Sequence, residues 1–358
     1  MRYLFFIIIS ILLYLQTDTI VAFFSKEKEL LVVEKIVHNP STDIKKQSKL
    51  SNTEKSILAN HHAHIFVYHR FADTKHPSTS TSKKELEKEF NYFKNNGYTV
   101  VALEKIIAKL KKKEEIPSKW VALTIDDAYK SFYENGLEVF KKFNYPFTLY
   151  VYVEATNRNY PDFMSWDEIK ESAKYGTIGL HSYSHPHLPK LSHDEIVKDT
   201  KQAIDIFEQH MGFLPKTYAY PYGEYDEKVK NAIKTFNFDA IINQSIGTVT
   251  NSSDLNDIFR LALVGDVNIK HKLRYNTLDA IWIEPKVYPK DKILRHIKAK
   301  VNPKIKKLKL YVTGNGWQDI KVKDGLVDLR VNIKLTRART RIMLGTDVFT
   351  IANKIIIK

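Results

Sequence analysis

The sequence of 358 residues contains no cysteine. This absence excludes disulfide bonds, a cysteine nucleophile, thiolate metal ligands and a lipid anchor attached to cysteine. Hydrophobic residues nevertheless make up 43% of the chain, so a sizeable core can form. The length is sufficient for one large domain and one small domain.

The sequence also lacks an N-terminal apolar run of the length expected for a membrane-spanning helix. The run at residues 3–15 follows the basic Arg2 and has the length of the apolar part of a secretory signal. Residues 20–22 offer a small-residue site for cleavage. We therefore predict that residues 1–24 are a signal peptide or, as the alternative, an uncleaved N-terminal anchor. In both cases most of the protein would be extracytoplasmic: periplasmic, secreted or tethered to a membrane through its N-terminus.

Negative charge is scarce at the C-terminal end of the chain. Residues 270–358 hold 22 Lys and Arg against 7 Asp and Glu, which accounts for the whole formal charge of +15. This asymmetry predicts a basic module whose partner is an anionic envelope polymer or a membrane surface. Arg337, Arg339 and Arg341 occupy alternate positions and are expected to form one exposed face of a sheet. A solvated surface that only keeps the module soluble is the alternative, and no nucleic acid is expected because no motif for it is present.

Apolar runs alternate with helix-like patterns in the middle of the chain. Strands are expected at residues 65–68, 98–103, 121–125, 146–153, 177–180, 217–220 and 239–243. Helical segments separate them; the first begins at a capping box, Ser82-Lys83-Lys84-Glu85, whose end side chains can satisfy free backbone N–H groups. Repeated strand–helix units predict a parallel sheet that is closed or nearly closed as a barrel.

The pattern changes after about residue 274. Short strands are expected at residues 279–284, 308–313, 327–335, 340–344 and 354–357. Such strands, separated by Gly, Asn and Asp, are typical of a small antiparallel β-sandwich. We therefore divide the chain into a signal peptide or anchor at 1–24, a flexible spacer at 25–60, an α/β barrel at 61–268 and a basic β-sandwich module at 269–358.

Three segments that follow expected strands carry residues able to hold a metal. They are Thr124-Ile125-Asp126-Asp127, His181-Ser182-Tyr183-Ser184-His185 and Ala219-Tyr220-Pro221-Tyr222-Gly223. In α/β barrels the C-terminal ends of the strands converge on the face that carries the chemistry. One carboxylate and two imidazoles at that face would bind a divalent metal and leave positions open for water and substrate.

Each segment also has a plainer interpretation. Asp126 and Asp127 could cap a helix, and His181 and His185 could be surface histidines in a polar loop. In combination the metal interpretation is preferred, because the two pairs stand at the ends of different strands. A carboxylate bound to a cation would stay ionised, while its neighbour could take a proton from water. The spacing does not fix which carboxylate touches the metal. His69 ends the first strand of the barrel and could protonate a leaving nitrogen or oxygen.

These residues resemble a known family. Thr-Ile-Asp-Asp, His-Ser-x-x-His and Tyr-Pro-Tyr-Gly, in this order, resemble the first three signature motifs of the polysaccharide deacetylases, carbohydrate esterase family 4, whose domain is called the NodB-homology domain. The resemblance implies a distorted (β/α)7 barrel. It also implies that Asp127, His181 and His185 are the metal ligands, that Asp126 is the catalytic base, and that Tyr222 supplies a backbone N–H to the oxyanion.

The resemblance covers about residues 62–265, with three departures. Ala128 replaces the glycine that usually ends the first motif, and Ala219 replaces an arginine that orients the base. Arg260 is a candidate for that missing partner. The late histidine motif of the family is not visible; the poly-β-1,6-N-acetylglucosamine deacetylases instead carry this histidine early, in a Tyr-His context that His69 matches. His69 is therefore the favoured general acid, and the later His271 is its alternative.

The sequence thus predicts a metal-dependent hydrolase that removes N-acetyl groups from an extracytoplasmic N-acetylhexosamine polysaccharide, with metal-bound water as nucleophile. Zinc is the default metal, although two histidines and one aspartate also suit Fe, Co or Ni. An O-acetyl esterase acting on an acetylated glycan would use the same site and is the first alternative. A carbohydrate-binding barrel that has lost turnover is the second, favoured by Ala219.

Overall fold

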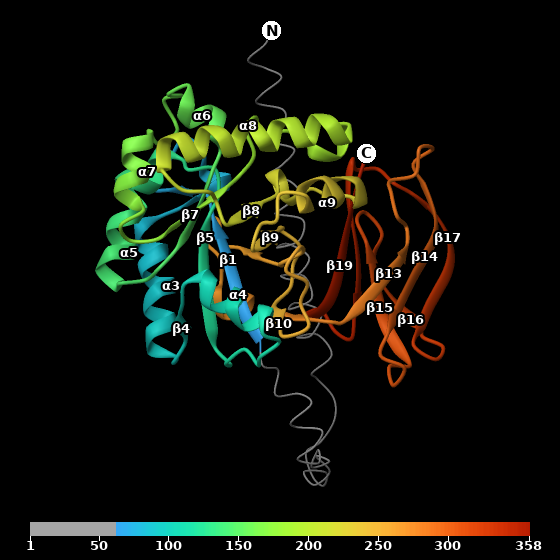
Figure 1. Ribbon diagram of the computed structural model, residues 1–358. Helices are drawn as coiled ribbons and strands as arrows, with labels where there is room; N and C mark the ends of the chain where they lie inside the picture. Colours follow the sequence, from blue (N-terminus) through green and yellow to red (C-terminus); the bar gives the residue numbers. More distant parts are fainter. Residues whose placement is uncertain (1–61) are drawn as a thin grey trace, which may run out of the picture. The chain divides into compact units, whose positions relative to one another are not determined.

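The computed structural model describes residues 62–358. The predicted signal peptide or anchor at 1–24 and the predicted spacer at 25–60 lie outside these residues. Across the described part of the chain, helices are too short or too polar to cross a membrane. Its elements form a barrel with outer helices and a C-terminal module built from strands β12 to β19 (Figure 1).

The barrel is a curled sheet with the strand order β10-β1-β5-β6-β7-β8-β9. The strands are β1 (His62–Tyr68), β4 (Thr99–Val100), β5 (Trp120–Ile125), β6 (Thr148–Val151), β7 (Thr177–Leu180), β8 (Thr217–Ala219), β9 (Ala240–Ile242), β10 (Val249–Thr250) and β11 (Leu261–Ala262). Strands β1 and β5 to β9 are parallel, and β11 returns parallel to β1. A bridge between Ile242 and Ile258 links β9 to the segment before β11, so the sheet curls back towards its first strand.

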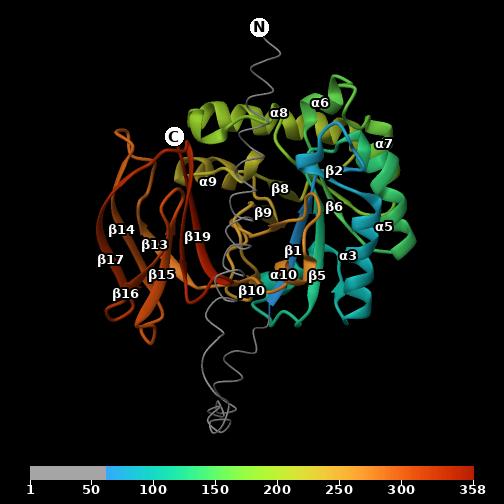
Figure 2. The ribbon, with the colours of Figure 1, turned by 180° about the vertical axis from the view of Figure 1, so that it is seen from behind.

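Helices cover the outside of this sheet. They are α3 (Lys83–Asn95), α4 (Leu103–Lys111), α5 (Leu137–Phe143), α6 (Val153–Asn157), α7 (Trp166–Ser172), α8 (His193–Met211) and α9 (Glu227–Lys234). Helices α3, α5 and α7 lie on the side of the barrel away from the C-terminal module (Figures 1 and 2). Helix α8 begins at a capping box made by Ser192 and Glu195 and ends at Gly212, whose φ of 79° suits glycine.

The prediction of a strand at residues 98–103 is only partly confirmed. Two residues, Thr99 and Val100, pair with β5, and α4 begins at Leu103. The buried residues of α4 recur at helical spacing, Leu103, Ile106, Ile107 and Leu110. The chain therefore leaves the sheet early because this apolar stripe packs best as a helix.

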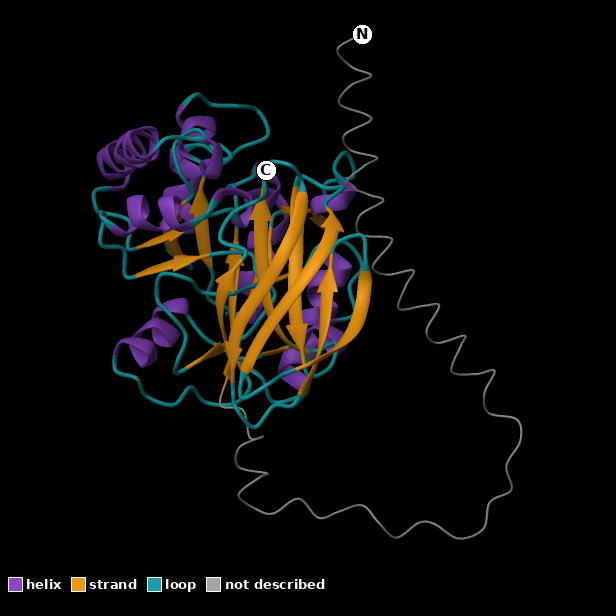
Figure 3. Ribbon diagram, turned by 90° about the vertical axis from the view of Figure 1, so that its right-hand side faces the viewer, coloured by secondary structure: helices purple, strands orange, loops and turns teal. Residues whose placement is uncertain are grey.

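The C-terminal module consists of two facing sheets (Figure 3). Its strands are β12 (Asn276–Thr277), β13 (Ala280–Glu284), β14 (Ile293–Val301), β15 (Lys307–Val312), β16 (Gly316–Lys321), β17 (Leu326–Lys334), β18 (Arg339–Gly345) and β19 (Thr350–Ile357). One sheet has the order β12-β19-β18-β15-β16 and the other β13-β14-β17. Apolar residues such as Leu294, Ile297, Leu310, Ile342 and Leu344 form a core separate from that of the barrel. Except where β12 meets β19, the strands are antiparallel, as predicted.

The prediction that Arg337, Arg339 and Arg341 form one exposed basic face is wrong. Arg337 is exposed, whereas Arg339 and Arg341 are mostly buried. Burial lowers the pKa of Arg341 to about 10, with Arg339 nearby. Arg341 lies close to Tyr275. Burial also lowers the pKa of Arg339, and the negative charge of Glu224 in the barrel opposes this shift. The alternation of β18 places these two arginines towards the barrel because the opposite face of the strand fills the sandwich core.

Candidate active site

Asp127, His181 and His185 converge at the C-terminal ends of β5 and β7. The Nε2 atoms of the two histidines are 3.2 Å apart. They lie 3.4 Å (His181) and 3.2 Å (His185) from Oδ1 of Asp127. This oxygen is buried and accepts no hydrogen bond from any described residue. Three donor atoms within 4.8 Å of one another, one of them an unpartnered carboxylate oxygen, fit a divalent cation.

The orientation of His181 favours metal binding. Its Nδ1 lies 2.8 Å from the carbonyl oxygen of Ala219. A carbonyl only accepts, so Nδ1 must carry the proton and Nε2 presents its lone pair to Asp127. Ala219, which stands where an arginine was expected, thus contributes through its backbone.

Asp199 of α8 holds the loop that carries both histidines through hydrogen bonds. Its carboxylate accepts hydrogen bonds from the backbone N–H groups of Tyr183 and Ser184, both at 2.9 Å, and from Oγ of Ser184 at 2.6 Å. The backbone N–H of His185 donates to Oγ of Ser182 at 3.0 Å. Sequence analysis missed Asp199; a carboxylate nearly two turns into an otherwise amphipathic helix carries no local signal of this role.

Left-handed backbone conformations are concentrated around the site. Positive φ angles occur at Asp127 (73°), Ala128 (56°), Ser182 (65°), His185 (48°) and Tyr222 (59°). This region is costly for residues with a Cβ and is retained where the surrounding structure enforces it. The angle at Ala128 also shows why glycine suits that position of the motif.

Asp126 has a different environment from Asp127. Arg260 grips it with two hydrogen bonds, from Nη1 to Oδ1 at 2.7 Å and from Nη2 to Oδ2 at 2.8 Å. Arg260 is itself fixed, because Nε donates to the carbonyl of Asn243 and Nη1 to Oγ1 of Thr124. Gln244 adds a third donor to Asp126, at 3.1 Å. Arg260 therefore occupies the role that Ala219 left open.

The charges around the two carboxylates keep both ionised. Burial alone would raise the pKa of Asp126, but the charges of Arg260 and His181 and the hydrogen bonds from Arg260 hold it below its ordinary value. Burial likewise opposes ionisation of Asp127, yet the neighbouring His181 and His185 set its pKa well below the usual range. Both neighbouring carboxylates are therefore ionised, but Asp126 faces Arg260 whereas Asp127 faces the two histidines.

His69 lies beside this cluster, directly after β1. Burial lowers its pKa, while Asp127 and Asp126 are close enough to oppose that shift. Its Nδ1 atom is buried without a hydrogen-bond partner in the described chain. His271 lies elsewhere, on α10 (Ile269–Lys272), where its ring contacts Phe349 at 4.9 Å. The structure thus places His69, and not His271, beside the candidate ligands.

Tyr222 lies in the turn at Pro221–Gly223. The residue is 39% exposed, and its ring stacks on His187 at 4.4 Å and meets His185 edge-on at 4.4 Å. Gly223 permits this turn, because a Cβ there would lie 2.7 Å from the backbone nitrogen of Gln244. The tyrosine thereby forms part of an aromatic rim next to the histidines.

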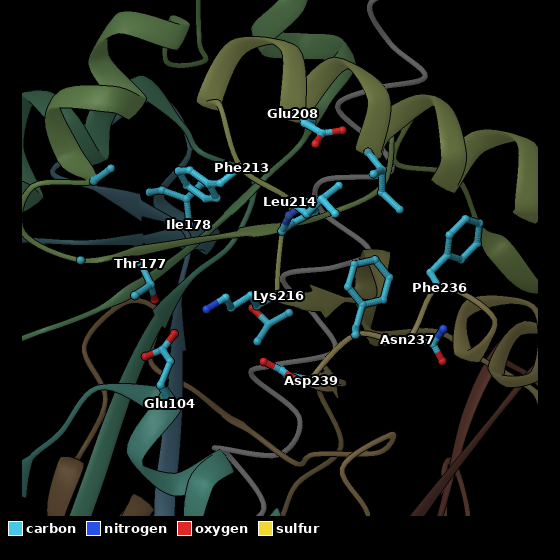
Figure 4. Close-up of a pocket in the computed structure, with 16 residues that line it drawn as sticks. Glu104, Thr177, Ile178, Glu208, Phe213, Leu214, Lys216, Phe236, Asn237 and Asp239 are labelled. Carbon is cyan, nitrogen blue, oxygen red and sulfur yellow. The ribbon is translucent and has the colours of Figure 1, made fainter.

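A larger cavity lies away from this site. It has a volume of about 1030 Å³ and is lined by residues at the start of β7 and β8, including Thr177 and Thr217 (Figure 4). Its apolar side chains include Phe213, Leu214 and Phe236. The ligand set is at the opposite ends of the same strands, so this cavity is not part of the candidate metal centre.

Residues 113–241 match the family model described as polysaccharide deacetylase. A poly-β-1,6-N-acetyl-D-glucosamine N-deacetylase of Staphylococcus aureus (strain MSSA476) is 28% identical over 207 residues, which cover 52% of this chain and 71% of the relative.

Two solved structures share the fold. The Streptococcus pyogenes deacetylase PplD in complex with acetate has a TM-score of 0.55 at 19% identity, covering 60% of this chain and 97% of its own. IcaB from Ammonifex degensii has a TM-score of 0.52 at 23% identity, and the match covers 57% of this chain and 93% of IcaB. The prediction of a distorted (β/α)7 barrel is confirmed.

Proposed function

We propose that this chain is a polysaccharide deacetylase that removes N-acetyl groups from a hexosamine polysaccharide, because residues 113–241 match the polysaccharide deacetylase model and the staphylococcal relative is 28% identical. The observation that carries this proposal is the pair of adjacent buried carboxylates with unlike partners. Asp127 turns an unpartnered oxygen towards two histidines, whereas both oxygens of Asp126 are held by Arg260. Asp127 is therefore suited to bind a cation, and Asp126 is suited to act as a base.

The residues of the cluster fit a divalent metal such as zinc. Asp127, His181 and His185 would hold it. When bound, the metal would act as a Lewis acid towards the acetyl carbonyl and lower the pKa of a water molecule.

The other residues then have distinct tasks. Asp126 takes a proton from the water molecule whose oxygen forms a bond to the carbonyl carbon, and Arg260 keeps this carboxylate ionised and oriented. The backbone N–H of Tyr222 donates to the carbonyl oxygen as it becomes negative. His69 gives a proton to the nitrogen as the carbon–nitrogen bond breaks. The products are acetate and a free amine on the sugar.

The similarity to the staphylococcal enzymes favours poly-N-acetylglucosamine as the substrate class, since those relatives are named for it. The aromatic rim of Tyr222 and His187 beside the histidines suits the apolar face of a sugar ring. A substrate of this kind would place the reaction outside the cytoplasm, in keeping with the predicted signal or anchor. Attachment of the basic C-terminal module to anionic polymers or lipids remains a separate prediction, now without Arg339 and Arg341 in its surface.

The proposal is tested by acetate release. The protein without residues 1–24 is loaded with zinc and given β-1,6-linked N-acetylglucosamine oligomers or acetylated xylan. We expect release from the N-acetylated oligomers that disappears when the metal is chelated. Release from the xylan alone would make the protein an O-acetyl esterase. Binding of the oligomers without release from either substrate would make it a carbohydrate-binding barrel.

A further inference from the structure

A second hollow lies where the barrel meets the C-terminal module. It has a volume of about 510 Å³ and is lined by the start of α9 and the loop near Asp254 on the barrel side, and by β13 and β19 on the other. We call it the interdomain groove. Its lining includes Tyr225 and Pro189, which follow Tyr222 and His185 closely in the chain. Because these pairs are only three and four residues apart in the chain, the groove begins close to the candidate active site.

Asn353 of β19 is the feature of the groove that points to a ligand. Its side chain lines the hollow, and the residue is only 6% exposed. Neither Oδ1 nor Nδ2 has a hydrogen-bond partner among residues 62–358. Burying an unpaired amide is costly, and native proteins rarely leave both atoms unused. One acceptor and two donors on adjacent atoms match the hydroxyl and amine groups of a sugar.

The walls around Asn353 are suited to an extended chain of sugars. Beyond Ile351, β19 has a neighbouring strand, β18, on one side only, because β12 pairs with just Thr350 and Ile351. The free edge borders the groove. Trp282 of β13 lines it as well and is partly exposed, and aromatic rings stack on sugar rings or attract bound cations.

The charge of the groove is opposite to that of the surrounding module. Five carboxylates line it against three lysines: Asp226, Glu227, Asp254, Asp257 and Asp279 against Lys230, Lys286 and Lys354. Lys230 is engaged by Asp254 and Asp257. Glu227 and Asp279 are exposed and form no salt bridge within the described chain. The lining therefore favours a ligand with positive charge.

We infer that the interdomain groove binds a stretch of hexosamine polymer whose amines are already free. Asn353 bonds the sugar hydroxyl and amine groups, Trp282 contacts a ring, and Glu227 and Asp279 face the protonated amines. This inference rests on the proposed function, because deacetylation is what supplies those amines. The enzyme would then hold a converted segment while the active site works on a neighbouring one.

The test uses a glucosamine hexamer as the probe, measured by calorimetric titration of the protein lacking residues 1–24. We expect Asn353→Ala and Glu227→Gln each to weaken binding by roughly fivefold, the equivalent of one hydrogen bond or a weak charge pair. Two matched substitutions at exposed positions outside the groove, Asn332→Ala on β17 and Glu208→Gln on α8, serve as controls and should bind as the unmodified protein does.

Stability provides a second readout for Asn353. Because its amide is unpaired without ligand, Asn353→Ala should raise the thermal midpoint by about 2 °C while weakening the binding of the hexamer. An asparagine that only supports the fold would lower the midpoint instead. Unchanged affinity in both Asn353→Ala and Glu227→Gln, or no binding of the hexamer by the unmodified protein, overturns the inference.

The same preparations separate this inference from the proposed function. Acetate release from the N-acetylated hexamer is measured in parallel. Normal release with unchanged hexamer binding in the variants rejects the groove and leaves the function standing. Hexamer binding that depends on Asn353, without acetate release by the unmodified protein, supports the groove as a sugar site and rejects the function.

Discussion

The two ends of the barrel differ in what they bury. The C-terminal ends of the strands enclose Asp126, Asp127, His181 and Arg260, each at most 6% exposed. The N-terminal ends border a cavity of about 1030 Å³ with much apolar lining. Among the described residues, the converging metal ligands lie at the C-terminal ends and do not line this cavity. The buried charges with defined partners therefore favour the C-terminal ends as the candidate reactive end, whereas cavity volume alone would favour the other end.

Loss of a histidine ligand should have the largest effect at the reactive end. We expect His181→Ala and His185→Ala to abolish stoichiometric zinc binding and acetate release, because two remaining ligands hold a metal too weakly. Metal content of the purified variants checks this. A variant that keeps one zinc per chain would show that the ligand set is wrong.

His69→Ala should lower kcat by roughly two to four orders of magnitude and leave zinc content intact, since it removes a proton donor and no ligand. The exposed His193 of α8 provides a control, His193→Ala, which should turn over normally. If His69→Ala is as active as the control, the leaving nitrogen takes its proton from another group.

Replacing Arg260 should damage both stability and turnover. Arg260→Met leaves the buried Asp126 without its cationic partner, which should cost about 3–5 kcal/mol in the free energy of unfolding. Urea denaturation measures this loss, with Arg330→Met on the exposed face of β17 as the control. A loss below about 1 kcal/mol, the range of a surface pair, would mean that Arg260 does not hold Asp126.

Much of the reactive end could be predicted because its signals are local. The strands of a parallel sheet are buried on both faces, so they appear as continuous apolar runs, and the candidate ligands directly follow them. Arg260 could be named only as a candidate, since its bond to Asp126 spans 134 residues and depends on β11 returning beside β1. The orientation of Arg339 and Arg341 was mispredicted because alternation separates the two faces of β18 but does not reveal which face another domain covers.

A pH effect should arise beneath the reactive end, at Glu89 of α3. Burial raises its pKa from 4.5 to about 8, although Tyr68 donates a 2.7 Å hydrogen bond to it. The folded state thus favours the protonated form; its contribution to stability is full below about pH 4.5 and is lost as pH rises to 8. We expect Glu89→Gln to raise the free energy of unfolding by about 4 kcal/mol at pH 8 and not at pH 4.5. Equal effects at both pH values would contradict the shift.

The smallest effect should come from the other end of the barrel. Leu214, 55% exposed, borders the large cavity. Leu214→Ser should leave kcat and KM within about twofold, because a surface substitution away from the reacting groups changes little. A tenfold change in either constant would bring that cavity into the reaction.

The central claim is that the neighbouring carboxylates Asp126 and Asp127 divide the work between base and ligand. The most direct measurement is zinc content together with acetate release from N-acetylated oligomers in Asp126→Asn and Asp127→Asn. We predict that Asp126→Asn retains one zinc per chain and loses turnover, whereas Asp127→Asn loses both. Zinc loss in Asp126→Asn with retention in Asp127→Asn, or near-normal turnover in Asp126→Asn, would contradict the account.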